Sequence, residues 1–238
     1  MSLLELHGLS KKFGGLVANQ DVSFIVKASQ IVGLIGPNGA GKTTTFNCIA
    51  GYYAPSSGHI TLEGRTISGL PPQACARAGV GRTFQVARTF TSMTAGENVL
   101  AAALLHRKRI AAARVEALRW LAFVGLERLA DRPAASLTIS EQRRMAVARA
   151  LAIEPRILLM DEVMAGLNPS EVREMVAVVL RIREHGIACL VVEHVLEGIM
   201  PIADRIVVLD RGVKIADGTP AEVSRDPAVI SAYLGDEA

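Results

Sequence analysis

The stretch from Gly36 to Thr43 has the residue types and the spacing of a phosphate-binding loop. It reads Gly-Pro-Asn-Gly-Ala-Gly-Lys-Thr, which matches the pattern G-x-x-x-x-G-K-[ST]. Glycines let the backbone curl until successive N–H groups point into one concavity, and a helix that begins there adds the positive end of its dipole. In this pattern Lys42 reaches the β- and γ-phosphates of a nucleotide, and the hydroxyl of Thr43 binds Mg²⁺. The residues predicted to contact the nucleotide are Gly36, Pro37, Asn38, Gly39, Ala40, Gly41, Lys42, Thr43 and Thr44.

The segments on either side of this loop favour phosphate binding over an ordinary tight turn. Ile31–Ile35 is a short apolar run that predicts a buried strand. Thr44–Ala50 predicts the first turns of a helix, which Gly51 would end. A turn capped by a helix, without any ligand, is the alternative. Strand, loop and helix nevertheless follow in the order that phosphate binding requires.

A pair of acidic residues follows a second apolar run. Ile157–Met160 predicts a buried strand, and Asp161 and Glu162 come directly after it. At the end of such a strand Asp161 would hold Mg²⁺ through water, and Glu162 would take a proton from the water that attacks the γ-phosphate. The alternative is an acidic surface loop, which the upstream phosphate loop makes less favoured.

Two further polar residues end predicted strands of the same sheet. Gln85 follows the run that begins at Val80, and His194 follows Ile187–Val192. Because parallel strands deliver their carboxyl ends to one edge, both would lie near the phosphate loop. There Gln85 would bridge Mg²⁺ and the attacking water, and His194 would bond the γ-phosphate, although a lone histidine is more often a core residue. The predicted catalytic residues are Glu162, His194, Lys42 and Gln85, and the predicted Mg²⁺ ligands are Thr43, Gln85 and Asp161.

The N-terminal third of the chain is rich in predicted strands and holds one helix. Leu4–Leu9 alternates apolar and polar residues like an edge strand. Val22–Val26 alternates in the same way, and His59–Leu62 predicts another strand after a turn. We expect these segments to form an antiparallel β subdomain.

The remainder combines a helical insert with alternating strands and helices. From about Thr94 to Leu129 apolar residues recur at helical spacing, so we place a helical subdomain at about residues 86–153 within a single domain, 1–238. Alternation of strands and helices predicts a mainly parallel sheet with helices on both faces. The later elements predicted are a helix over 142–151, the strand Ile157–Met160, a helix over Ser170–Glu184, the strand Ile187–Val192 and a hairpin over Ile206–Ala216.

Composition argues against several other classes of protein. The net charge of +3 is too small to indicate nucleic-acid binding, and aromatic residues make up only 4% of the 238 residues. No apolar run is long enough for a membrane span, and the first residues lack the features of a signal peptide. We therefore expect a cytoplasmic protein without a nucleic-acid partner, whose membrane role, if it has one, depends on other subunits.

In chain order, these motifs resemble the ATP-binding subunit of an ABC transporter, a P-loop NTPase. The resemblance implies that Phe13 stacks on adenine, that Gln85 belongs to the Q-loop and that His194 is the switch histidine. Leu137–Gln142 lies where the family signature lies, and Ala165–Asn168 matches the D-loop. The family pattern covers nearly the whole chain.

The resemblance also implies an assembly. Two such subunits would clamp head to tail around two ATP molecules and drive a pair of integral-membrane permease subunits. In that arrangement Thr138 and Ser140 would contact the ATP held by the opposite subunit, which is either a paralogue or a second copy of this chain. The protein would then be peripheral on the inner face of the cell membrane.

Other segments are similar to the branched-chain amino acid uptake branch of the family, in particular its larger ATPase subunit. They are Gly81–Gln85, Met93–Val99 and Ala232–Gly235. Such systems use an extracytoplasmic solute-binding protein, so the implied transport is inward. Relatives in the branch carry amides or urea, which leaves the solute open. Phe90 and its neighbours Arg88 and Thr89 would form the groove for the membrane subunit, or would simply belong to the core.

The chain departs from the family pattern at two places. Where the signature usually reads Leu-Ser-Gly-Gly-Gln, Ser140 replaces a glycine and Glu141 replaces the glutamine. A carboxylate near phosphate is repelled by more than the helix dipole stabilises it, so we expect Glu141 to turn away from the phosphate. Val163 stands where a proline usually follows the glutamate, which predicts a less rigidly aimed Glu162. We therefore expect this signature to complete a weaker composite site.

Two other functions remain possible from sequence. A non-transport ABC ATPase of DNA repair or translation would carry a coiled coil or a second nucleotide domain, and the chain has neither heptads nor a duplication. A regulatory subunit that binds ATP but hydrolyses it weakly is favoured by the altered signature.

Overall fold

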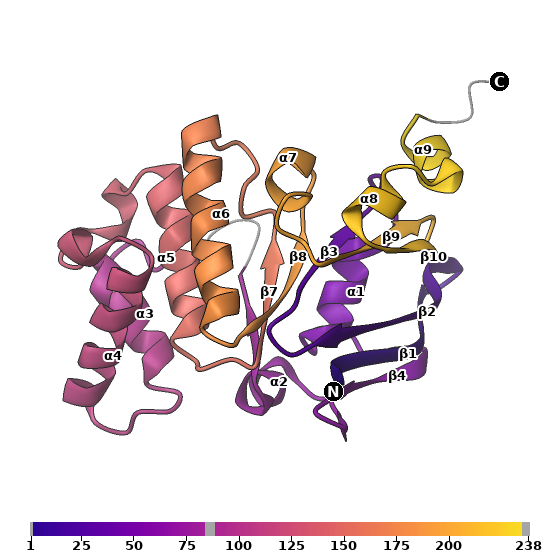
Figure 1. Ribbon diagram of the computed structural model, residues 1–238. Coiled ribbons are helices and arrows are strands. Elements are labelled where there is room, and N and C mark those ends of the chain that lie inside the picture. Colours follow the sequence, from indigo (N-terminus) through magenta and orange to yellow (C-terminus); the bar gives the residue numbers. More distant parts are fainter. Residues whose placement is uncertain (1, 84–88, 235–238) are drawn as a thin grey trace.

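The computed structural model describes residues 2–83 and 89–234 of the chain (Figure 1). Its strands form a four-stranded sheet in the order β2-β1-β4-β5 and a six-stranded sheet in the order β10-β9-β3-β8-β7-β6. The strands are β1 (Ser2–Phe13), β2 (Leu16–Lys27), β3 (Ile31–Ile35), β4 (Ser57–Leu62), β5 (Arg65–Thr66), β6 (Val80–Arg82), β7 (Ile157–Asp161), β8 (Ala188–Val192), β9 (Arg205–Asp210) and β10 (Val213–Gly218). The helices are α1 (Lys42–Ile49), α2 (Pro72–Ala78), α3 (Ala95–Ala103), α4 (Ile110–Phe123), α5 (Ile139–Leu151), α6 (Pro169–Glu184), α7 (Leu196–Ile199), α8 (Pro220–Val223) and α9 (Pro227–Leu234).

The six-stranded sheet carries the strands that precede the predicted site. Every residue of β3, β7 and β8 is buried. The strands from β9 to β6 pair in parallel, and β10 pairs with β9 in the antiparallel sense. The predicted α/β fold with a mainly parallel sheet is therefore confirmed. Because parallel strands end at one edge, the residues after β3, β7 and β8 emerge together, namely Gly36, Glu162 and Glu193.

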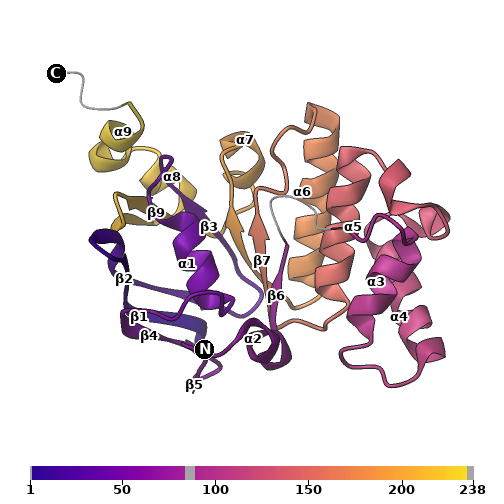
Figure 2. The same cartoon turned by 180° about the vertical axis from the view of Figure 1, so that it is seen from behind.

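Strand β3 illustrates how both faces of this sheet are covered. Val32 and Leu34 belong to a core with Phe46 of α1 and the antiparallel sheet, whereas Ile31 and Ile35 belong to a core with α6 and the helical part. Figure 1 shows α6 and α7 on the near side of the sheet, and Figure 2 shows α1 on the opposite side. A strand covered on both faces is uniformly apolar, which is why Ile31–Ile35 shows no alternation.

Strand β1 lies inside the four-stranded sheet, so the prediction of an edge strand at Leu4–Leu9 is wrong. Leu6 pairs with Phe24 of β2 on one side and with Ile60 of β4 on the other. The alternation has another cause: Leu4 and Leu6 are buried while the residues between and after them face outward. An antiparallel sheet with one solvated face gives this pattern even in an inner strand. The antiparallel arrangement of these strands is as predicted.

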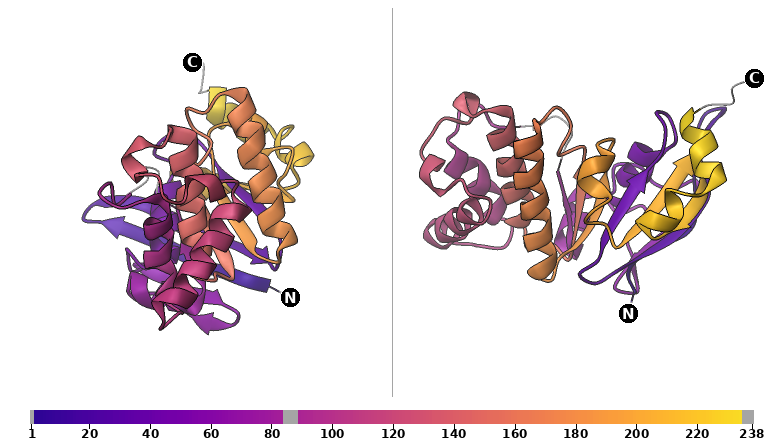
Figure 3. Two further views of the ribbon diagram at one scale, coloured as in Figure 1. Left: turned by 90° about the vertical axis from the view of Figure 1, so that its left-hand side faces the viewer. Right: turned by 45° about the horizontal axis from the view of Figure 1, so that its top comes forward.

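Helices α3, α4 and α5 pack at one end of the molecule, opposite the antiparallel sheet (Figure 3, right panel, where α3 and α4 are magenta). Short 3₁₀ turns at Glu127–Leu129 and Ala134–Ser136 lead from α4 to α5. Trp120 of α4 is 3% exposed and packs in this helical core. The division of the chain at about residues 86–153 stays a prediction.

Strand β6 ends at Arg82, earlier than the predicted strand, and Gln85 lies outside the described residues. Near the C-terminus, α9 packs beside β10. None of the helices within the described ranges is both long and apolar enough to cross a membrane.

Candidate nucleotide-binding site

Two glycines of the phosphate loop occupy positions that a larger residue could take only after a rearrangement. Gly36 has φ = 147°, and a Cβ built on it would lie 2.0 Å from the carbonyl oxygen of Leu209 in β9. Gly41 has φ = 95°, and its Cβ would lie 2.4 Å from Nδ2 of Asn19 in β2. The loop is therefore held against two strands at distances that only glycine allows.

Lys42, the first residue of α1, is buried inside the curl of the loop. Its Nζ donates hydrogen bonds to the carbonyl oxygens of Gly36, at 2.6 Å, and Pro37, at 2.8 Å. Burial lowers the pKa of Lys42, while the carboxylates of Glu162 and Asp161 raise it. The ammonium group thus already lies within the field of the acidic pair. The same group could exchange its carbonyl partners for phosphate oxygens.

A hollow of about 440 Å³ brings most of the predicted nucleotide contacts together. Its lining consists of Phe13, Leu16, Val17 and Ala18, the loop residues 38–44, Glu162 and His194. Phe13 is 41% exposed, and its ring meets Tyr53 edge to face, with ring centroids 5.1 Å apart. Nζ of Lys11 lies 4.9 Å from the centroid of Phe13. A hollow lined by both an exposed aromatic residue and the phosphate loop suits a nucleotide.

Asp161 is a buried carboxylate held by an arginine that the sequence did not single out. Arg82 of β6 places Nη2 3.3 Å from Oδ2 of Asp161 and donates through Nη1 to Oδ1 of Asn47 in α1, at 2.6 Å. The hydroxyl of Thr83 accepts the backbone N–H of Asp161 at 3.2 Å. Burial raises the pKa of Asp161, and the charge of Arg82 lowers it. This network fixes the carboxylate beside α1.

Glu162 adopts a backbone conformation that is rare for a residue with a side chain. Its φ is 51°, in the left-handed region. Its N–H bonds the carbonyl of Val192 in β8, at 2.9 Å, and its Oε1 lies 3.1 Å from Nε2 of His194. Such strain is found at functional sites where the surroundings hold the backbone in place. Glu162 and His194 are therefore brought together at the hollow, as the order of the strands predicts.

Arg143 and Glu193 contact the turn after Glu162, and sequence reasoning missed both. Nη1 of Arg143, from α5, donates to the carbonyl oxygen of Glu162 at 2.6 Å. Oε1 of Glu193, which is 1% exposed, accepts the backbone N–H of Met164 at 2.7 Å. The only sequence signal for Glu193 is a charged residue at the end of the fully apolar run Ile187–Val192.

The signature segment lies outside this hollow, at the start of α5. The hydroxyl of Thr138 accepts the N–H of Glu141 at 3.2 Å, and Oε2 of Glu141 accepts the N–H of Thr138 at 2.8 Å. This capping box folds the Glu141 carboxylate back onto the helix end, while Ser140 is buried and Ile139 is 64% exposed. Thr138 and Ser140 are thus separate from the phosphate loop of their own chain.

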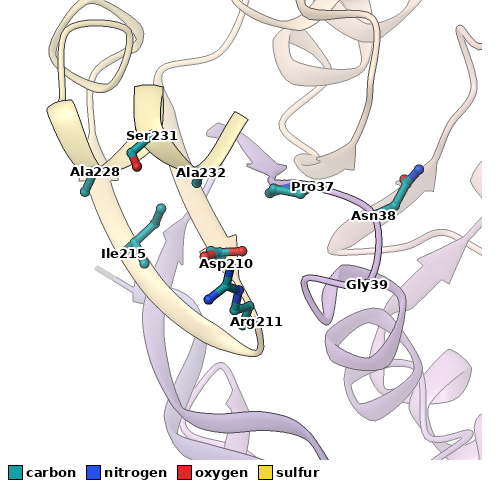
Figure 4. A pocket seen from close by; sticks show the side chains of 9 residues that line it. All are labelled: Pro37, Asn38, Gly39, Asp210, Arg211, Ile215, Ala228, Ser231 and Ala232. Atoms are coloured by element: carbon teal, nitrogen blue, oxygen red, sulfur yellow. The ribbon is translucent and has the colours of Figure 1, made fainter. Parts of the chain in front are cut away.

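A second hollow, of about 470 Å³, lies between the phosphate loop, the β9–β10 hairpin and α9 (Figure 4). Pro37, Asn38 and Gly39 line it on one side, and Ile215, Ala228 and Ser231 are among the residues on the other. The side chain of Asn38 points away from this hollow in Figure 4. Lys42, Glu162 and His194 line the first hollow, which is therefore the candidate site.

Comparison with known families decides the identity. Residues 19–165 match the family described as ABC transporter, and residues 213–238 match the one described as branched-chain amino acid ATP-binding cassette transporter. The chain belongs to the ABC transporter family. The resemblance drawn from its motifs is confirmed, including the branched-chain amino acid branch.

Two curated relatives of this ABC protein match over almost their whole length. The chain is 44% identical to the high-affinity branched-chain amino acid transport ATP-binding protein BraF of Pseudomonas aeruginosa, with 98% of each chain covered. It is 42% identical to the corresponding protein LivG of Escherichia coli K12, again with 98% of each covered.

Solved structures give the same result for the fold. An ATP-binding cassette of an ABC transporter in its ADP conformation has a TM-score of 0.90 and 29% identity, and the match covers 99% of this chain and 100% of that one. A dimeric ATP-binding cassette in a post-hydrolysis state, bound to ADP and phosphate, has a TM-score of 0.83 and 25% identity, covering 92% of this chain and 99% of that one. The predicted ABC ATPase fold is confirmed.

Proposed function

We propose that this ABC ATPase binds and hydrolyses Mg²⁺-ATP to drive the import of branched-chain amino acids. The observation that carries the hydrolytic part is the Glu162–His194 contact, 3.1 Å long, at the hollow that the phosphate loop lines. The relatives BraF and LivG, named as branched-chain amino acid transport proteins, support the cargo.

The residues of the hollow divide the work of phosphoryl transfer. Lys42 and the N–H groups at the start of α1 neutralise the phosphates, while Phe13 stacks on the adenine. Glu162 orients a water molecule and accepts its proton, and His194 hydrogen-bonds the γ-phosphate. The contact between Glu162 and His194 keeps the base and the phosphate sensor within one hydrogen-bonded unit.

Magnesium fits the oxygen donors that the chain provides. Thr43, which carries a hydroxyl, lines the hollow, and Asp161 is a buried carboxylate close enough to Lys42 for their charges to interact. Hydroxyl and carboxylate oxygens are the ligands that Mg²⁺ prefers, with water or phosphate completing the shell. Gln85, the third predicted ligand, lies outside the described residues. Bound there, the ion would neutralise charge on the β- and γ-phosphates.

A complete site needs a second subunit. Thr138 and Ser140 begin α5, away from the hollow of their own chain, and would contact ATP on a paralogue or a second copy. The post-hydrolysis dimer among the structural relatives supports such pairing. Two integral-membrane permease subunits, which would hold this chain at the inner face of the membrane, and an extracytoplasmic solute-binding protein complete the proposed importer, and nucleic acid has no part in it.

Substitution of the proposed base tests hydrolysis. Glu162→Gln keeps the size of the side chain but cannot accept the proton, so we expect normal ATP binding and a turnover reduced on the order of a hundredfold or more. Glu184→Gln, which removes an exposed carboxylate from the end of α6, is the control and should behave like the wild type. A Glu162→Gln protein with wild-type turnover in the assembled transporter would refute the assignment.

The cargo is tested separately from the chemistry. ATPase activity of the reconstituted importer should rise when its binding protein carries leucine, isoleucine or valine. Stimulation by an amide or urea instead would assign the chain to those relatives of the branch. An ATPase that stays slow with every solute would favour the regulatory subunit that the altered signature allows.

A further inference from the structure

The turn after Glu162 is fastened at two successive points by side chains from different elements. Arg143, on α5, donates to the carbonyl oxygen of Glu162 at 2.6 Å. Glu193, directly after β8, accepts the N–H of Met164 at 2.7 Å. The two contacts lie on either side of Val163, the residue that replaces the usual proline. Side-chain hydrogen bonds thus restrain a turn that lacks a proline ring.

Glu193 is an unusual choice for a purely structural role. It is 1% exposed, and its second oxygen, Oε2, has no hydrogen-bond partner among the residues that the structure describes. Burial raises the pKa of Glu193 to about 7, although the Met164 N–H and the charge of Arg143 lower it. A serine or asparagine would satisfy one backbone N–H without burying an ionisable group. The position therefore bears a cost that a plain turn would not require.

The same residue also adjoins the other half of the catalytic pair. Glu193 directly precedes His194 in the chain, and Nε2 of His194 lies 3.1 Å from Oε1 of Glu162. Met164, whose N–H Glu193 holds, packs its sulfur against Gly198 of α7, where an added Cβ would lie only 2.5 Å from Sδ. Glu193 therefore links the two segments. Its side chain holds the turn after Glu162, and its backbone leads directly into His194.

We propose that Glu193 is a positioning residue for ATP hydrolysis, which holds the turn after Glu162 so that the Glu162 carboxylate stays directed at the phosphate loop. The proposal rests on Glu162 being the general base. The left-handed φ of 51° at Glu162 needs such support, because a free chain would relax out of that region. The reach of the side chain to the Met164 N–H is what matters, and its charge is secondary.

A pair of substitutions separates reach from charge. Glu193→Gln keeps the length and an oxygen that accepts the Met164 N–H, but removes the charge. Glu193→Asp keeps the charge but shortens the reach by about one carbon–carbon bond, ~1.5 Å. Glu116→Asp is the matched control, because Glu116 is also buried and is paired with Arg107 and Arg119 in the helical part.

We expect Glu193→Asp to lower kcat on the order of tenfold to a hundredfold, since a displacement of ~1 Å near the chemistry has effects of that size. KM for ATP should stay within about threefold of the wild type, because Lys42 and the phosphate loop are untouched. Hydrogen exchange of the peptide that spans residues 162–167 should become faster. Glu193→Gln should keep kcat within about threefold, and Glu116→Asp should leave kcat unchanged.

Four results would overturn the proposal. They are a wild-type kcat in Glu193→Asp, a Glu193→Gln protein as impaired as Glu193→Asp, a loss confined to KM, and unchanged exchange over 162–167. All measurements use the assembled transporter, with Glu162→Gln beside them. If Glu162→Gln retains turnover, the base assignment itself fails; if it is inactive while Glu193→Asp is normal, only the role of Glu193 fails.

Discussion

At the scale of single residues, the site depends on buried charges that are held by partners distant in sequence. Asp161 and Arg82 are 79 positions apart and form an ion pair whose side chains are 5% and 10% exposed. Breaking a buried pair by removing one partner leaves an uncompensated charge, which costs far more than the intact pair contributes. The carboxylate of Asp161 is therefore important both for the stability of the fold and for the proposed Mg²⁺ site.

Arg82→Met should destabilise the fold by about 3 kcal/mol, because it leaves Asp161 buried without its ion-pair partner. Asp161→Asn in the same chain removes that charge, so the double variant should lose less than the sum of the two single losses. Urea unfolding of the three variants measures the coupling. Additive losses would show that the two side chains do not stabilise each other.

The raised pKa of Glu193 predicts that the free energy of unfolding depends on pH. Burial raises its pKa from 4.5 to about 7, while the unfolded chain keeps the ordinary value. Between these pH values the folded state binds more protons than the unfolded one, so this group makes the free energy of unfolding fall as pH rises. The charged groups that face it are Arg143, on α5, and Glu162, after β7.

Glu193→Gln removes this titration. Relative to the wild type, its free energy of unfolding should therefore improve as pH rises from about 4.5 to about 7, by on the order of 3 kcal/mol at most. Urea unfolding at pH 5 and at pH 7.5 provides the comparison. Parallel pH curves for the two proteins would mean that Glu193 ionises normally.

Gly36→Ala should cost roughly 3 kcal/mol or more, because strain at positive φ adds to a clash. The new Cβ would lie 2.0 Å from the carbonyl oxygen of Leu209, at φ = 147°. Gly64→Ala is the control: Gly64 also has a positive φ, 75°, but apart from its chain neighbours no atom of the described residues would lie within 4 Å of its Cβ. Denaturant unfolding should show a loss of only about 1 kcal/mol there. Equal losses would exclude the clash as the cause.

At the scale of helices and strands, the sequence predicts those features that follow from the residue pattern within one segment. The uniformly apolar runs Ile31–Ile35 and Ile157–Met160 identify buried strands, and the polar residues after them identify the edge that carries the site. Alternation in Leu4–Leu9 reports a solvated face, which an inner antiparallel strand and an edge strand share. Which strands pair is decided when the chain folds and cannot be read from the pattern within one strand. This is why the assignment of Leu4–Leu9 to an edge strand was wrong.

The supporting residues of the site were not predictable for the same reason. Neither Arg82 nor Arg143 is marked by its neighbours in sequence, and only tertiary packing brings them to Asp161 and to the carbonyl of Glu162. Glu193 was missed because only the residue after it, His194, matches a family motif. Residues that fit a motif are visible from spacing, whereas residues that hold the motif in place require the contacts.

The start of α5 carries a prediction about the altered signature. Gln completes a capping box as well as Glu does, so Glu141→Gln should leave stability within about 0.5 kcal/mol of the wild type, whereas Thr138→Ala should lose about 1 kcal/mol. Combined with Ser140→Gly, Glu141→Gln removes a negative charge and a side chain from the proposed phosphate contact. ATP affinity or turnover of the assembled transporter should rise. If neither rises, the altered signature does not weaken the composite site.

At the scale of the whole molecule, the two halves of the proposed ATP contact lie on different parts of the chain. Figures 1 and 2 both show β7 between α1, which follows the phosphate loop, and α5, which begins with the signature. One chain therefore offers a phosphate loop at one place and a signature at another. Head-to-tail pairing is the arrangement that would use both.

This geometry predicts that a change in the signature affects the partner's site and spares its own. Ile139, the first residue of α5, is 64% exposed, so Ile139→Glu should fold normally, because a carboxylate in the first turn of a helix is favourable. The isolated variant should bind ATP with wild-type affinity, while turnover of the assembled transporter falls on the order of tenfold or more through repulsion of the opposing γ-phosphate.

Ile110→Glu is the control, because Ile110 is the first residue of α4 and is 65% exposed. Lys42→Ala should show the opposite pattern and lose ATP binding in isolation. Loss of ATP binding by the isolated Ile139→Glu protein would place the signature in its own chain's site and would rule out the head-to-tail arrangement.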